Sequence, residues 1–191
     1  MNTSLAAPRN WLAALFSTFS LLLMIIVDIK EFNIQYDEPL RLLRVEWAGG
    51  HEMRRLRPAL EQLHKLAYRL QPTHALLSLN DLPDISAYDQ IWLGAQWLPK
   101  AERLALRQAV VVLDTKQVYN QQAIETLLSF GRHQPQLDFQ FFRQAAAGMQ
   151  WLANDSVRLP VLFSEWAATY GPPSPNASVA AEPLPHYGRP R

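Results

Sequence analysis

A chain of 191 residues is long enough for one domain of ordinary size with additional terminal segments. Its hydrophobic residues make up 49% of the sequence, enough for a buried core, and its formal net charge of +1 gives no field that would favour nucleic acid. The absence of cysteine excludes a disulfide framework, a thiol nucleophile, a cysteine-ligated zinc and an iron–sulfur site. This composition is compatible with a cytoplasmic protein.

The first 30 residues (1–30) form an apolar N-terminal segment with two possible interpretations. Residues 11–27 (WLAALFSTFSLLLMIIV) carry no charge and are just long enough to span a bilayer, with Arg9 on the cytoplasmic side. Read this way, they anchor the protein in a membrane. Alternatively, translation starts at Met24, directly before a first strand, and the protein is cytoplasmic. Both interpretations stay open at this point.

From residue 31 onward, apolar residues recur with strand and helix periods in alternation. The short turn between the first two strands predicts an antiparallel hairpin. Helical segments, the first of them amphipathic, then separate short apolar strands, which predicts a sheet with a parallel portion. The expected strands are 32–36, 40–47, 75–79, 109–113 and 137–142, and the expected helices are 53–70, 91–98, 100–106, 118–130 and 143–152.

These elements predict an α/β domain over residues 31–152. Residues 153–170 include an apolar segment, 159–170, which we expect to pack on the domain as a C-terminal extension. Residues 171–191 are rich in Pro, Ala and Ser, which is typical of a disordered tail.

The order of several stretches resembles the SpoIIAA-like branch of the STAS/Sec14-type domains over residues 32–152. The matching stretches are YDEPLRLLRVEWAG, ALLSLND, DQIWLGAQWLP, AVVVLD and FQFFRQAAAGMQWL. The resemblance implies a STAS-like mixed sheet of four to five strands with helices mainly on one face. It also implies a regulatory role through docking on partner proteins, without enzymatic activity. The phosphorylated members carry an Asp-x-Ser…Ser-x-Gly pattern that residues 81–86 lack.

The expected helix 91–98 is apolar on nearly every face, more than one core-facing stripe requires. We assign the stripe of Ile91, Ala95 and Leu98 to the sheet. Trp97 then faces a partner or ligand, since tryptophan is common at binding hot spots. A helix buried in the core would account for the same residues. The candidate partner or ligand surface comprises Trp92, Trp97, Pro99 and Lys100.

Ser86 and Asp89 precede this helix with the spacing of a capping box. A hydroxyl at a helix N-terminus could instead be a phospho-acceptor. Capping explains both residues without a further assumption, and we favour it.

No enzyme or cofactor motif is present. The five histidines lack metal-ligand spacing, and the chain contains no Gly-x-Ser-x-Gly elbow and no phosphate-binding glycine loop. We therefore expect a non-enzymatic regulatory or protein-interaction module without a cofactor. The alternative is a carrier or sensor that binds a lipid or small apolar ligand between the sheet and helix 91–98. A large pocket would favour the alternative, whereas a flat, exposed Trp97 would favour protein docking.

Overall fold

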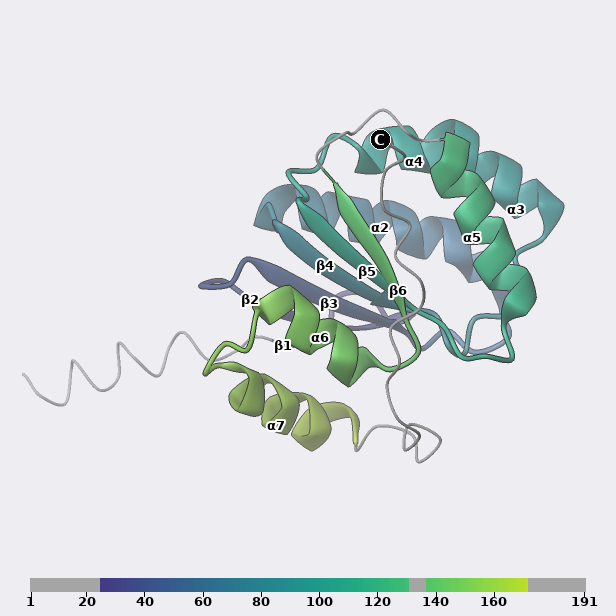
Figure 1. Cartoon of the computed structure of the whole chain (residues 1–191). Helices are drawn as coiled ribbons and strands as arrows, with labels where there is room; N and C mark the ends of the chain where they lie inside the picture. The colour runs from purple at the N-terminus through teal and green to yellow at the C-terminus, as the bar shows by residue number, and fades with distance from the viewer. Residues whose placement is uncertain (1–24, 131–136, 172–191) are drawn as a thin grey trace, which may run out of the picture.

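The computed structural model describes residues 25–130 and 137–171, which form a six-stranded sheet with helices on both faces (Figure 1). The strands are β1 (Ile25–Ile26), β2 (Phe32–Asp37), β3 (Leu42–Trp47), β4 (His74–Ser78), β5 (Gln108–Val112) and β6 (Asp138–Phe142). The helices are η1 (Met53–Arg55), α2 (Leu56–Leu70), α3 (Ala87–Trp92), η2 (Leu93–Trp97), α4 (Leu98–Ala101), α5 (Val118–Phe130), α6 (Ala145–Ala153) and α7 (Leu159–Tyr170).

The strands lie in the sheet in the order in which they occur in the chain. The first three pair antiparallel, and β3 to β6 pair parallel. A crossover between parallel strands is almost always right-handed, so successive crossovers that advance in one direction place their helices on the same face. The helices α2, α3 to α4 and α5 accordingly cover one face, and α6 and α7 cover the other (Figure 1).

The α/β class and the antiparallel hairpin are confirmed, and each expected strand forms within one or two residues of its predicted bounds. One expectation needs correction. The sheet has a sixth strand, because Ile25 and Ile26 pair with β2 at the antiparallel edge, so four to five strands is too few. Most of the helices lie on one face, and the segment 159–170 forms a helix that packs with α6 on the opposite side.

Alternation along the parallel strands divides the core into two layers. Leu77 and Val111 point toward α2, η2 and α5, whereas Leu76 and Val110 point toward α6 and α7. We call these the cavity face and the α6–α7 face. Both are apolar because a parallel sheet covered on both sides is buried on both sides.

Several earlier expectations concern residues outside the described ranges. Residues 1–24 hold most of the proposed anchor, and residues 172–191 hold nearly all of the expected disordered tail. Within residues 25–130 and 137–171, no helix is long and apolar enough to cross a bilayer.

Candidate ligand-binding cavity

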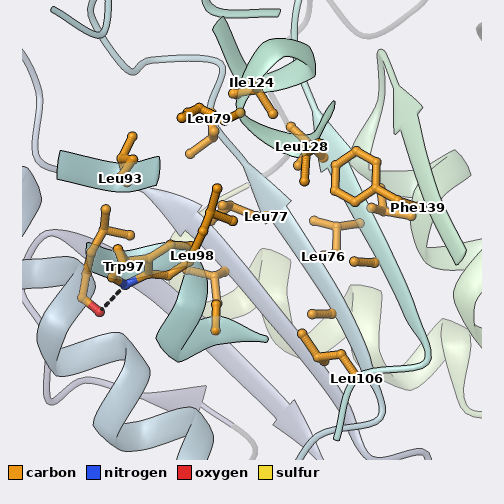
Figure 2. A pocket seen from close by; sticks show the side chains of 18 of the residues that line it. Leu76, Leu77, Leu79, Leu93, Trp97, Leu98, Leu106, Ile124, Leu128 and Phe139 are labelled. Atoms are coloured by element: carbon orange, nitrogen blue, oxygen red, sulfur yellow. Dashed lines mark hydrogen bonds between the residues drawn. The ribbon is translucent and has the colours of Figure 1, made fainter. Parts of the chain in front are cut away.

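A cavity of about 1300 Å³ lies between the sheet and the helices of the cavity face (Figure 2). Its lining is mostly leucine, valine, isoleucine and alanine from β3 to β6, α2, η2 and α5. Ligand pockets commonly enclose about 300–1,000 Å³ and are predominantly apolar. The volume therefore suits a ligand of lipid size.

The sheet forms the floor of the cavity, and two small side chains on it leave space beneath the helices. Ala75 on β4 and Ala109 on β5 are directly paired across the ladder, and both belong to the lining. One pair further along, Leu77 lies beside Val111. Leu77 is on a central strand beneath a helical layer, yet it is only half-buried. The helices therefore stand away from the middle of the sheet at this place.

The wall above the floor contains a π-helical turn, η2, in which the chain takes one residue more per hydrogen-bonded turn than an α-helix. This register buries Leu93 and directs Trp97 along the cavity (Figure 2). The indole Nε1 of Trp97 donates a hydrogen bond to the carbonyl oxygen of Leu60 on α2, at 3.0 Å. The bond ties η2 to α2 and leaves the apolar rings of the indole at the cavity wall.

The burial of the lining residues shows which end of the cavity is closed. Leu79, Leu82 and Ile85 follow the carboxyl end of β4 and are buried. Leu106 and Phe139, near the amino ends of β5 and β6, are only half-buried, as is Leu128 on α5. Figure 2 shows these three side chains around one side of the cavity. We infer that the cavity opens where the α4–β5 connection, α5 and β6 meet.

The structure separates the four residues of the predicted partner or ligand surface. Trp97 lines the cavity, whereas Trp92 is half-buried against the core beneath the guanidinium of Arg57, 5.3 Å from the ring centre. Pro99 is exposed. The Nζ of Lys100 lies 2.6 Å from Glu61 Oε1 on α2. These residues do not form one continuous surface, and of the four only Trp97 belongs to the cavity.

The predicted sheet-facing stripe is wrong at two of its three positions. Ile91 is 67% exposed and Ala95 is exposed, whereas Leu98 lines the cavity. The prediction chose the wrong face of the helix. Leu93 and Trp97, which are four residues apart and so share one face, point inward instead. Ile91 lies in α3, before the π-helical turn.

Ser86 is the N-cap of α3. Its Oγ accepts a hydrogen bond from the backbone N–H of Asp89 at 3.1 Å and donates one to Asp89 Oδ2 at 2.6 Å. The other carboxylate oxygen of Asp89 accepts from Arg57 Nε at 2.8 Å. Through these hydrogen bonds, Ser86 and Asp89 join the start of α3 to Arg57 on α2.

A buried polar cluster, which the sequence did not reveal, lies on the α6–α7 face. Gln35 and Arg44 are paired across β2 and β3, and each is at least nine-tenths buried. The Arg44 guanidinium stacks on the Trp166 ring at 3.5 Å from its centre and lies 3.7 Å from Glu46. Burial lowers the pKa of Arg44 to about 10, against the opposing effect of Glu46. Burial also raises the pKa of Glu46, which the Arg44 charge partly offsets.

In the part of the chain that the structure describes, no three His, Asp or Glu side chains are grouped so that they could hold a metal ion. Comparison with known proteins found no matching family model, no matching curated protein and no matching solved structure.

Proposed function

We propose that this protein binds a lipid or another apolar molecule in the cavity, as a carrier or sensor rather than as an enzyme. The observation that carries the proposal is the cavity of about 1300 Å³ with its apolar lining. The position of Trp97 also supports a carrier over a docking module, because Trp97 turns into a large pocket and does not present a flat surface.

The apolar lining favours an apolar occupant. Apolar side chains in contact with water are unfavourable by roughly 25 cal/mol for each Å² of exposed surface, and an apolar ligand in the cavity would remove that surface from water.

The local structure of the wall supports the same proposal. π-Helical turns are rare, and they occur frequently at functional sites. Here the turn carries the indole of Trp97 to the cavity and Gly94 to within 3.2 Å of Leu127 on α5, measured from the position of an added Cβ. The π turn therefore shapes the space between α2 and α5.

Binding of the neutral, apolar dye Nile red to the full chain tests the proposal. Ala109→Phe places a ring on the cavity floor and should weaken dye binding strongly. Ala146→Phe makes the same change on the exposed side of α6 and should leave binding unchanged. Native mass spectrometry of the purified protein should show a bound apolar molecule whose occupancy falls in the Ala109→Phe variant.

The melting temperature of the ligand-free variants makes the test decisive. If the cavity exists in solution, Ala109→Phe fills space and should keep or raise the melting temperature. A large drop for this variant, or equal dye binding by both variants, would overturn the proposal.

A second candidate function is docking of a protein partner, as the resemblance to regulatory STAS-like domains implies. The sequential parallel strands with their crossover helices on one face are in keeping with that resemblance. The specific observation is an exposed surface of Tyr88, Ile91 and Tyr119, which are 73%, 67% and 47% exposed. This surface spans α3 and α5, which are joined by a hydrogen bond of 3.1 Å from Gln90 Nε2 to the Tyr119 hydroxyl.

A photo-crosslinking amino acid at position 91, used in cells, tests this second candidate. The control places the same amino acid at Val157, which is 92% exposed on the other side of the domain. A protein crosslinked from position 91 and not from position 157 would support docking. Identical products from both positions would contradict it.

A further inference from the structure

The open part of the cavity floor lies along one row of the sheet. The strand register places Leu43, Ala75, Ala109 and Phe139 in line across β3 to β6, all on the cavity face. Ala75 and Ala109 are only half-buried, although β4 and β5 are inner strands of the sheet beneath a helical layer. Both belong to the cavity lining, so the empty space reaches down to these two side chains.

Larger side chains surround the two alanines and give the hollow between them its outline. Leu43 and Phe139 stand at the two ends of the row, and Leu77 and Val111 stand beside it in the next row of the same face. Adjacent strands lie about 4.8 Å apart, and residues on one face of a strand lie about 7 Å apart. The hollow therefore measures about 10 Å across the strands and about 7 Å along them.

A hollow of these proportions suits a flat ring system better than a single alkyl chain. Carbon atoms in van der Waals contact are about 4 Å apart, so one extended chain would fill only part of the width. Aromatic side chains also flank the space. Phe139 is half-buried and packs edge-on against Phe141, with the ring centres 5.1 Å apart, and Figure 2 shows Trp97 on the opposite side of the cavity. Such residues pair favourably with further flat rings.

From this geometry we propose that the ligand contains a flat, apolar system of fused rings that lies over Ala75 and Ala109, and that these two alanines determine the specificity of the cavity. The inference rests on the proposed function and names the ligand class of the same site. A rigid ring system also loses less conformational freedom on binding than a flexible chain does, so the same contact area gives tighter binding.

Displacement of Nile red from the full chain by 1-pyrenemethanol and by decanol tests the inference. Both molecules carry a hydroxymethyl group, which is attached to fused rings in the first and to a linear chain in the second. Each affinity is divided by the partition of that molecule from water into hexadecane, which removes the difference in hydrophobicity. After this correction, 1-pyrenemethanol should bind at least about fivefold more tightly than decanol.

Valine variants locate the effect on the floor. Ala75→Val and Ala109→Val each add two methyl groups to the hollow, which should weaken 1-pyrenemethanol about tenfold and decanol about twofold or less, because a chain can bend past them. The dye's own affinity for each variant enters the calculation. Ala146→Val makes the same change on the exposed side of α6 and should alter neither affinity. Equal weakening of both molecules by the floor variants would overturn the inference.

The outcomes separate the two proposals. If Nile red does not bind the full chain, the proposed function fails and this inference fails with it. If Nile red binds but the corrected affinity of decanol equals or exceeds that of 1-pyrenemethanol, the cavity binds apolar ligands and only the assignment of the ring system is wrong. This comparison uses the unaltered chain, so it decides the inference even where a valine variant does not fold.

Discussion

The two faces of the sheet bury the same strands in different ways. On the α6–α7 face, Gly148 lets α6 approach so closely that an added Cβ would lie 2.7 Å from Val110 Cγ1 and 3.0 Å from Leu76 Cδ1. On the cavity face, the neighbouring residues Leu77 and Ala109 remain only half-buried. One face of the sheet is therefore closely packed, whereas the other leaves a cavity beside the same strands.

Truncation of core side chains should separate the two faces most clearly. Met149→Ala should lower the unfolding free energy by about 2–5 kcal/mol, because Met149 is fully buried on α6. Leu128→Ala on α5 should cost less than about 1 kcal/mol, since this side chain is half-buried beside an existing space. Urea denaturation of both variants checks this. Equal losses would mean that the cavity face is packed as densely as its opposite.

Arg44 tests the polar part of the α6–α7 face. Arg44→Ala removes the stacking on Trp166 and leaves space under α7, so we expect a loss of about 2–3 kcal/mol. Arg44→Met keeps most of the volume and removes a charge that burial disfavours, as the lowered pKa of Arg44 indicates. Its stability should stay within about 1 kcal/mol of the original protein. An equal loss in both variants would show that the charge itself stabilises the fold.

Two glycines allow the same substitution on each face. Gly148→Ala should destabilise by about 1–3 kcal/mol, because the added methyl group meets buried side chains on two strands. Gly94→Ala in η2 meets one atom, Leu127 Cδ2 at 3.2 Å, and should be neutral or stabilising by up to about 1 kcal/mol. Thermal unfolding of both variants measures the difference. The reverse order would contradict the assignment of the close contact to α6.

Ser86 should have the smallest effect. Ser86→Ala removes an N-cap and should cost about 1 kcal/mol. Ser86→Asn should cost less than Ser86→Asp, because an amide can still donate to the Asp89 carboxylate whereas a second carboxylate repels it. Chemical denaturation of the three variants gives the order. A more stable Asp variant would show that the bond between Ser86 and Asp89 contributes little.

The sequence predicted the strands well because the decisive residues are local. Runs such as AVVVL around β5 are short and rich in β-branched valine, which is typical of a buried strand. Ile25 and Ile26 were not counted as a separate strand, because they lie in an apolar run that reads either as the start of a first strand after Met24 or as part of a membrane anchor. The position of α7 was missed because its polar contacts with β2 join residues more than 120 positions apart.

The site was predicted only in part, for a physical reason. Trp97 could be chosen as a candidate from composition, but helix 91–98 is apolar on nearly every side, so the sequence did not show which face turns toward the sheet. The floor carried a weak signal that was not used. Ala75 and Ala109 are small residues at matching positions of two buried strands, where larger residues would fill the layer.

The packing of α7 on the sheet has a consequence for the nascent chain during synthesis. Gln35 Nε2 donates to the Leu162 carbonyl at 3.0 Å, and Arg158 Nε lies 2.7 Å from Asp37 Oδ2, so the first half of the sheet receives polar partners from the last described helix. A ribosome adds roughly 5–20 residues per second, and the strands emerge first. For several seconds the back of β2 and β3 is therefore exposed on the nascent chain. A stall or truncation before α7 would leave this surface, with its buried Arg44 and Gln35, available to chaperones and proteases.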